Sequence, residues 1–320
     1  MAQSILENPF KGRDVISARD FSRKDLEVLF STADKIVQTK EGVQVPSELR
    51  RDGKVVSLLF YEPSTRTYES FARAGHLIGC YVNGFREPKV SSASKGESLA
   101  DTVRTFEQLD TSCFVIRSPH PGAPLSASKL TDMPVINAGD GPREHPTQAM
   151  GDLYTILKRK GTIDGLQIGV MGDLRYGRTP PSLSYMLANY DVKRLVFIAP
   201  SSHLQIGENV ELELKRRGIA YEKSNDPKGS VGDLDILYVT RVQKERFTEP
   251  TDYEKIKGSY VVDKSLVESG KNNLLIMHPL PRIDELTPDV DDLKNAAYFP
   301  QVGYGKLVRT ALLSLTLGDK

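Results

Sequence analysis

The first half of the chain alternates short apolar runs with stretches in which apolar residues recur three and four positions apart. Such runs are typical of buried strands, and the three-four spacing is typical of amphipathic helices. An opening helix is expected after Ser22, because Asp25 completes a helix-start signal there. The apolar runs lie at residues 55–60, 80–85, 113–117 and 134–138. Strands that alternate with helices predict a parallel sheet covered by helices.

The same alternation begins again in the second half, which indicates a second α/β domain. Its apolar runs lie at residues 168–173, 195–200, 235–240 and 274–279. A helix that begins near Pro146 is expected to join the two domains. A last helix over 306–317 has no strand of its own, so we expect it to return to the first domain. The prediction is two doubly wound parallel-sheet α/β domains joined by interdomain helices, with bounds 1–146 plus 304–320 and 147–303.

The composition narrows the class of protein and leaves the chemistry to local motifs. Lys plus Arg number 43 and Asp plus Glu number 42, so the net charge of +1 favours neither nucleic acid nor a membrane as a partner. No apolar run approaches the roughly 18 residues of a membrane span, and the N-terminus has no signal-peptide pattern. We therefore expect a cytoplasmic protein. Cys80 and Cys113 have no metal-type spacing around them and are expected to be buried, reduced thiols.

The segment after the run at 55–60 carries the first candidate site. It reads YEPSTRTYESF, and Ser64 could cap a helix whose first turn holds Thr65, Arg66 and Thr67. Free backbone amides at a helix start, hydroxyl donors and a guanidinium that binds two oxygens suit a phosphate dianion. A plain Ser-capped helix with a solvated arginine is the alternative, and this motif alone leaves both open.

Three more polar residues follow strands of the same predicted sheet. Arg117 ends the run at 113–117, and His145 and Gln148 follow the run at 134–138 in the string NAGDGPREHPTQ. Open α/β sheets bind ligands along the edge where their strands end. One such residue alone is more often an ordinary surface residue. Several turns that converge on one edge predict a binding site.

The strings STRT, HPTQ and HPLPR, with GDLRYGRT and TRVQKERF before the last, closely resemble those of the aspartate carbamoyltransferase family. The resemblance covers nearly the whole chain in the family's order. STRT and HPTQ alone would fit the wider superfamily, which also contains ornithine carbamoyltransferase. TRVQKER and HPLPR resemble the aspartate enzyme, whereas the ornithine enzyme typically carries a cysteine where this chain has Pro279.

The resemblance implies transfer of a carbamoyl group from carbamoyl phosphate to L-aspartate, the committed step of de novo pyrimidine (UMP) biosynthesis. It assigns the phosphate to four residues: Ser64, Thr65, Arg66 and Thr67. It assigns the carbamoyl end to three others: Arg117, His145 and Gln148. Donors from Thr67, Arg117 and His145 would stabilise the charge that develops on the carbonyl oxygen. This chemistry requires no metal ion or cofactor, and we expect neither.

The resemblance also implies the binding site for aspartate. Bidentate arginines suit carboxylates, and the second domain has Arg178 in GDLRYGRT and Arg241 in TRVQKER, with Gln243 beside the latter. Without the resemblance, both arginines could be solvated loop residues. Leu280 and Pro281 of HPLPR are implied to form a cis peptide that faces the carbamoyl and amine groups, with an ordinary trans turn as the alternative. The catalysis implied is electrostatic, and the domains close on aspartate.

By the same resemblance, the loop KVSSASKGESLADT acts on a neighbouring subunit. Ser91 and Lys95 would reach into that subunit's active site, which implies a homotrimer with shared sites. Taken by itself, the segment would be a solvated loop before a helix that begins near Ser98. Regulatory subunits or a dihydroorotase are further candidate partners.

Two positions depart from the family's usual pattern. Ser118 stands where a histidine usually follows the arginine, and Tyr68 follows STRT where arginine is frequent. Loss of a ring behind Arg117 would loosen its position. A protein that senses carbamoyl phosphate or aspartate without turnover is one alternative function, although none of the matched catalytic positions is lost. A dinucleotide-binding protein is another, although no GxGxxG follows the first strand.

Overall fold

The computed structural model describes residues 8–40, 42–242 and 260–318. The chain divides into two compact units, Met1–Tyr154 with Tyr304–Lys320 and Thr155–Gly303. Helices α5 (Pro146–Lys160) and α11 (Tyr298–Thr316) each contribute residues to both units. The boundary between the two units falls inside α5, a few residues after the boundary that the sequence predicts.

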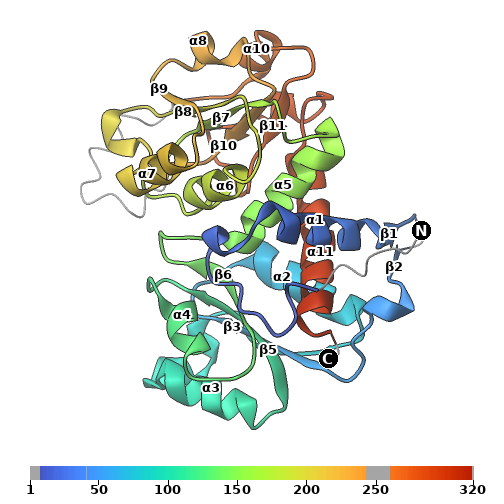
Figure 1. Ribbon diagram of the computed structural model, residues 1–320. Helices are drawn as coiled ribbons and strands as arrows, with labels where there is room; N and C mark the ends of the chain where they lie inside the picture. The colour runs from blue at the N-terminus through green and yellow to red at the C-terminus, as the bar shows by residue number, and fades with distance from the viewer. Residues whose placement is uncertain (1–7, 41, 243–259, 319–320) are drawn as a thin grey trace. The chain divides into compact units, whose positions relative to one another are not determined.

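The first unit is built on a parallel sheet of strand order β4-β3-β5-β6. Its strands coincide with the four predicted runs: β3 (Val55–Phe60), β4 (Tyr81–Phe85), β5 (Thr111–Ser118) and β6 (Val135–Asp140). The helices of this unit include α1 (Arg23–Asp34), α2 (Thr65–Leu77), α3 (Leu99–Glu107) and α4 (Ala123–Ser128) (Figure 1). Val103 of α3 and Ala127 of α4 pack on Phe114 and Ile116 of β5, so these two helices cover one face.

Two helix predictions for this unit are confirmed. Ser22 and Asp25 cap α1 reciprocally, because each side chain accepts a hydrogen bond from the other residue's backbone N–H. The last helix, α11, packs in the first unit, where Ser314 Oγ donates to the Leu49 carbonyl at 2.7 Å. It begins at Tyr298, earlier than the predicted start at 306.

The second unit has a parallel sheet of strand order β11-β10-β7-β8-β9. Four of its strands coincide with the predicted runs: β7 (Gln167–Met171), β8 (Arg194–Ile198), β10 (Ile236–Val239) and β11 (Leu275–Met277). The sequence did not predict β9 (Tyr221–Ser224), because this edge strand reads YEKS and has no apolar run. Its helices are α6 (Thr179–Leu187), α7 (Glu208–Arg216), α8 (Pro227–Val231) and α10 (Lys264–Glu268).

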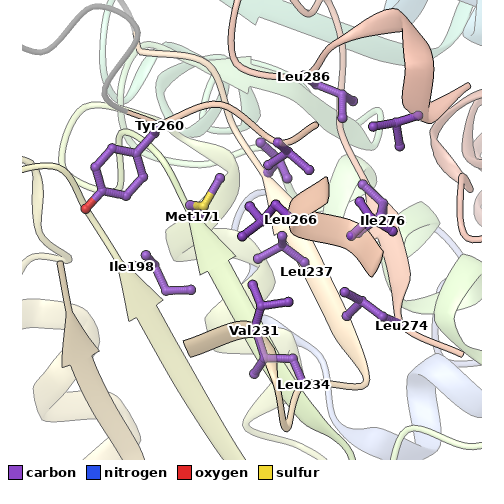
Figure 2. Packing of buried hydrophobic residues seen from close by; sticks show 14 of the residues in the cluster. Met171, Ile198, Val231, Leu234, Leu237, Tyr260, Leu266, Leu274, Ile276 and Leu286 are labelled. Carbon is purple, nitrogen blue, oxygen red and sulfur yellow. The ribbon is translucent and has the colours of Figure 1, made fainter. Parts of the chain in front are cut away.

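The core of this second unit lies between the sheet and the pair α8 and α10. Alternate residues of β10, Leu237 and Val239, belong to the same buried cluster as Val231 of α8 and Leu266 of α10. Figure 2 shows Leu237 with Val231 and Leu266. Helices α6 and α7 lie on the other face (Figure 1). Both faces of the central strands are therefore buried, which explains why these strands read as continuous apolar runs.

The remaining described elements are short. Strands β1 (Val37–Gln38) and β2 (Val43–Gln44) form a hairpin. The 3-10 helices are Ala18–Asp20, Ser47–Leu49, Pro88–Val90, Ser92–Lys95, Ser202–Leu204 and Pro288–Val290. Cys80 and Cys113 are buried free thiols, as predicted. Among the described residues, none of the helices has the length and apolar character needed to cross a membrane.

Candidate active site

The STRT segment joins the end of β3 to the start of α2. Ser64 has extended backbone angles and occupies the position before the first helical residue, Thr65. Its hydroxyl accepts no capping hydrogen bond from a described residue, whereas the hydroxyl of Ser98 caps α3 by accepting from Asp101 N at 3.1 Å. The structure therefore confirms the predicted helix start with Ser64 at its cap position, although the Ser64 hydroxyl itself makes no capping hydrogen bond with a described residue. That hydroxyl and the first-turn amides of α2 together suit an anion.

Arg117 lies at the end of the neighbouring strand, β5, in register with Phe60. Its Nη1 donates to the Ala138 carbonyl at 3.2 Å, and its Nη2 lies 3.2 Å from Glu62 Oε2. Only 11% of the Arg117 side chain is exposed. The sequence reasoning did not single out Glu62, although it lies in the YEPSTRT string just after the strand end that pairs with Arg117. The carboxylate and carbonyl fix the guanidinium beside the STRT turn.

His145 connects the third strand end, that of β6, to the STRT helix. The ring is buried, and its Nε2 lies 3.5 Å from Thr67 Oγ1. Its Nδ1 lies 3.5 Å from Thr147 Oγ1 at the start of α5. The structure thus brings Thr67, Arg117 and His145 to the carboxyl ends of three adjacent strands, as the sequence predicts.

A buried carboxylate anchors the turn that carries His145. Glu144 accepts hydrogen bonds from the Ser17 hydroxyl at 2.8 Å and from the Ala18 backbone N–H at 2.6 Å. Burial raises the pKa of Glu144 above its usual range, although these two hydrogen bonds lower it in part. Sequence reasoning missed Glu144, because its partners lie more than a hundred residues away.

Gln148 follows His145 by three residues on α5. Its amide Nε2 donates to Asp152 Oδ1 at 2.7 Å, and its Oε1 lies 3.5 Å from Nη2 of Arg309 on α11. Neither Asp152 nor Arg309 was singled out from the sequence. Asp152 could have been found by its spacing, because residues four apart on a helix are neighbours.

The two departures from the family's pattern have local partners in this unit. The Ser118 hydroxyl accepts from the His120 backbone N–H at 3.1 Å and so closes the turn after β5. Tyr68 packs edge-on against Phe60, and the guanidinium of Arg86 lies over its ring. Arg117 is held by Glu62 and a backbone carbonyl, so Ser118 does not leave it without support.

Ser91 and Lys95 lie in the segment between β4 and α3. The Ser91 hydroxyl donates to the Pro88 carbonyl at 2.9 Å, and Lys95 is exposed at the end of a 3-10 helix. Helix α3 begins directly after Ser98, as predicted. The action of this segment on a neighbouring subunit stays a prediction.

In the second unit, the two predicted arginines follow adjacent strands. Arg178 precedes α6 after β7, and Arg241 follows Thr240 at the end of β10, which pairs with β7. Thr240 N donates to the Met171 carbonyl at 2.8 Å. Gly172 allows the two turns to approach closely, since its φ is +121° and an added Cβ would lie 2.0 Å from the Thr240 carbonyl oxygen. Gln243 lies outside the described residues.

The HPLPR string follows β11, the strand beside β10. The Leu280–Pro281 peptide bond is cis, and Leu280 has a left-handed backbone with φ of 56°. Leu280 N donates to His278 Nδ1 at 2.8 Å, and His278 Nε2 lies 2.8 Å from Glu285 Oε1. Arg178, Arg241 and the HPLPR turn therefore all lie at the carboxyl edge of this second sheet.

Among the residues that the structure describes, no three His, Cys, Asp or Glu side chains are grouped so that they could hold a metal ion.

Family models match both units of the chain. Residues 13–158 match the carbamoyl-P binding domain of aspartate/ornithine carbamoyltransferase, and residues 164–316 match its Asp/Orn binding domain. The catalytic subunit of aspartate carbamoyltransferase from Thermococcus gammatolerans is 48% identical over 310 residues, 97% of this chain and 99% of the relative. The chain belongs to the aspartate carbamoyltransferase family. The corresponding subunit from Methanopyrus kandleri is 47% identical, over 97% of this chain and 98% of the relative.

Solved structures of the aspartate carbamoyltransferase family share the fold. The Trypanosoma cruzi enzyme in complex with N-(phosphonacetyl)-L-aspartic acid matches with a TM-score of 0.87 and 35% identity, over 98% of this chain and 99% of that chain. The same enzyme has been solved with carbamoyl phosphate and aspartate, with a TM-score of 0.87. The catalytic subunit of the M. jannaschii enzyme matches with a TM-score of 0.83 and 41% identity, over 94% of this chain and 97% of that chain. These matches confirm the predicted family and fold class.

Proposed function

We infer that this chain transfers the carbamoyl group of carbamoyl phosphate to the amino group of L-aspartate, which yields N-carbamoyl-L-aspartate and phosphate. The relatives named above carry that activity in their names, and the family supports it here. The observation that carries the inference is the approach of His145 Nε2 to Thr67 Oγ1 at 3.5 Å, because it joins the STRT and HPTQ motifs in one site. The reaction is the committed step of de novo pyrimidine (UMP) biosynthesis.

The first unit offers what carbamoyl phosphate needs. We assign its phosphate to the Ser64 hydroxyl and the first turn of α2, with Thr65, Arg66 and Thr67. We assign its carbonyl oxygen to donors from Thr67, Arg117 and His145. Negative charge grows on that oxygen as the amine attacks, so these donors bind the transition state more strongly than the substrate. Gln148 contacts the carbamoyl end beside them.

The second unit offers what aspartate needs. We assign the two carboxylates of aspartate to Arg178 and Arg241, with Gln243 beside the latter, because a guanidinium binds a carboxylate through two parallel hydrogen bonds. Leu280 and Pro281 lie on the third strand end of that edge, and we assign the Leu280 carbonyl to the carbamoyl and amine groups.

The chemistry is a substitution at the carbamoyl carbon. The amine nitrogen forms a bond to that carbon, and the bond from carbon to the phosphate oxygen breaks. The departing phosphate accepts the amine proton. The reacting atoms must come within about 3 to 3.5 Å of each other, so the residues of both units have to act on one pair of bound substrates. We expect the units to close on the substrates for this reason.

A homotrimer with shared sites remains part of the proposal. Under it, Ser91 and Lys95 serve the active site of the neighbouring subunit, and Lys95 adds a cation near the phosphate and the aspartate. Lys95 is exposed, and the side chains of Ser91 and Ser94 in its segment make local hydrogen bonds, which is compatible with that role. Regulatory or dihydroorotase subunits are further candidate partners, and the cytoplasm is the expected location.

A bisubstrate ligand tests whether both sets of residues act together. N-(phosphonacetyl)-L-aspartic acid carries a phosphonate and both aspartate carboxylates in one molecule. We expect it to bind at least about 100-fold more tightly than inorganic phosphate in calorimetry. Arg66→Ala and Arg178→Ala should each weaken that binding, whereas only Arg66→Ala should weaken the binding of phosphate. Retention of tight binding by either variant would contradict the assignment.

A further inference from the structure

Four polar residues from three helices of the first unit form one hydrogen-bonded chain around Gln148. Gln148 Nε2 donates to Asp152 Oδ1 at 2.7 Å, and both residues lie on α5. Arg309 on α11 donates from Nη2 to Gln148 Oε1 at 3.5 Å and from Nη1 to Ser70 Oγ on α2 at 3.0 Å. Asp152 is 0% exposed and Arg309 is 5% exposed, so both partners of the Gln148 amide are shielded from water.

The charges of Asp152 and Arg309 are compatible with only one orientation of the Gln148 amide between them. A guanidinium has no acceptor, and an ionised carboxylate has no donor. Burial lowers the pKa of Arg309 to about 10 and Asp152 raises it in part, so Arg309 is charged at neutral pH. Turning the amide over would set its oxygen against Asp152 and its NH₂ group against Arg309. Two hydrogen bonds would then become repulsive contacts in a buried region, where such contacts are costly.

The fixed orientation determines what Gln148 offers to a ligand. Its carbonyl oxygen has two lone pairs, and the long contact with Arg309 uses one of them. The other can accept a hydrogen bond. A carbamoyl group carries an NH₂ donor on one side and a carbonyl acceptor on the other, whereas an acetyl group has a methyl group in place of the NH₂. A fixed acceptor therefore distinguishes the two groups, although they have nearly the same shape.

We propose that Asp152 and Arg309 are positioning residues that hold the Gln148 amide with its oxygen toward the carbamoyl amine, and that they thereby select carbamoyl phosphate over acetyl phosphate. The proposal rests on the proposed function, in which Gln148 contacts the carbamoyl end. Asp152 and Arg309 touch neither substrate. They act through Gln148.

A merely structural role for these residues would have a different consequence. Arg309 also ties α2 to α11 through Ser70, and its guanidinium lies 5.4 Å from the centre of the Phe71 ring. If these hydrogen bonds only held the helices together, their disruption would disturb the whole anion site on α2. The affinities for carbamoyl phosphate, acetyl phosphate and inorganic phosphate would then fall by one common factor.

The test is calorimetric binding of those three compounds to the full chain in its native assembly. Asp152→Asn keeps the shape of the side chain, but it can donate as well as accept, so it no longer fixes the amide. We expect its dissociation constant for carbamoyl phosphate to rise about 10-fold, the loss of roughly one hydrogen bond's contribution. The constants for acetyl phosphate and inorganic phosphate should stay within about twofold. Ser314→Ala, which removes another buried hydrogen bond of α11, is the matched control and should leave all three constants unchanged.

Two further variants keep the proposal open to refutation if Asp152→Asn folds poorly. Arg309→Lys keeps the charge but cannot reach Ser70 and Gln148 together, so it should show the same selective loss. In a Gln148→Ala background, Asp152→Asn should have no further selective effect. An equal fall in all three affinities, no change in any of them, or a selective loss that persists without Gln148 would overturn the proposal. Failure of the wild-type protein to form carbamoyl aspartate would refute the proposed function instead. The ratios of the three dissociation constants would still show whether Asp152 and Arg309 orient Gln148.

Discussion

His278 and Glu285 form a buried pair at 2.8 Å that supports the turn of the HPLPR string. His278 is 1% exposed and accepts the Leu280 N–H on its other ring nitrogen at 2.8 Å. Nδ1 is therefore the unprotonated nitrogen, and the Nε2 proton faces Glu285. Although burial raises the pKa of Glu285, the hydrogen bonds from His278 and the backbone outweigh it, and the pKa lies below its usual range. Glu285 therefore acts as an anion that orients the ring.

Removal of that anion should release the turn. We expect Glu285→Ala to destabilise the protein by about 1.5 to 3 kcal/mol, because a buried charged hydrogen bond is lost. It should also raise the KM for aspartate, since Leu280 loses its fixed position. Glu285→Gln can still accept from His278 and is the control, with a smaller effect on both quantities. Urea denaturation and steady-state kinetics measure them. Equal effects of the two substitutions would contradict the orienting role of the anion.

Glu144 predicts a dependence of stability on pH. Its pKa is raised in the folded protein, so the folded state favours the protonated acid. The stability that this residue contributes is greatest below the unfolded pKa of about 4.3 and declines as pH rises through the folded pKa. Glu144→Gln cannot ionise and escapes that decline. The urea midpoint of the variant should therefore improve relative to wild type between pH 4 and pH 7. A difference that stays constant with pH would contradict this.

The close approach of the Thr240 carbonyl to Gly172 predicts that an added methyl group there costs much more stability than one at an unobstructed glycine. Gly172→Ala would set a Cβ 2.0 Å from the Thr240 carbonyl oxygen and strain a positive φ, so we expect a loss of more than about 3 kcal/mol of stability. Gly161→Ala is the matched control, because Gly161 also has a positive φ but no atom lies within 4 Å of its added Cβ. It should cost only about 1 kcal/mol. Thermal denaturation of both variants provides the comparison, and similar losses would contradict the steric account.

The position of His145 predicts that its removal slows the chemical step and leaves phosphate binding intact. We expect His145→Ala to lower kcat by roughly 100- to 1000-fold, the usual effect of removing one donor to a developing oxyanion. The dissociation constant of inorganic phosphate should hardly change, because phosphate is assigned to the STRT helix. His76→Ala, an exposed histidine in the last turn of the same helix, should leave both quantities unchanged. Loss of phosphate binding in His145→Ala with kcat preserved would reverse the assignment.

Shared sites predict recovery of activity in mixed assemblies. Arg66→Ala and Lys95→Ala chains should each be inactive alone, because each removes one contribution to every site. A mixed trimer would contain some sites with both residues intact, so the mixture should regain partial activity after reassembly. Arg66→Ala mixed with Arg117→Ala, whose residues come from one chain, is the control that distinguishes sharing between subunits from simple stabilisation. That control should regain no activity, because every chain in it lacks one residue of its own site, whereas no recovery in the first mixture would contradict shared sites.

The sequence predicted the parts of the fold that depend on local pattern. The apolar runs became strands because both faces of each sheet are covered, and the strand ends carry Thr67, Arg117 and His145 at one edge. The pattern could not predict β9, which is polar and lies at the edge of its sheet. It also could not pair Gln148 with Arg309, because the two residues are 161 positions apart and only helix packing brings them together.

The most direct test of the account is product formation from carbamoyl phosphate with L-aspartate or L-ornithine as the acceptor, using the purified chain without added metal. The account predicts carbamoyl aspartate and an equal amount of phosphate with aspartate, and no product with ornithine. Citrulline from ornithine would contradict the assignment of Arg178 and Arg241 to two carboxylates. Absence of product from both acceptors, in a chain that still binds carbamoyl phosphate, would contradict the catalytic role and favour a protein that only senses its ligands.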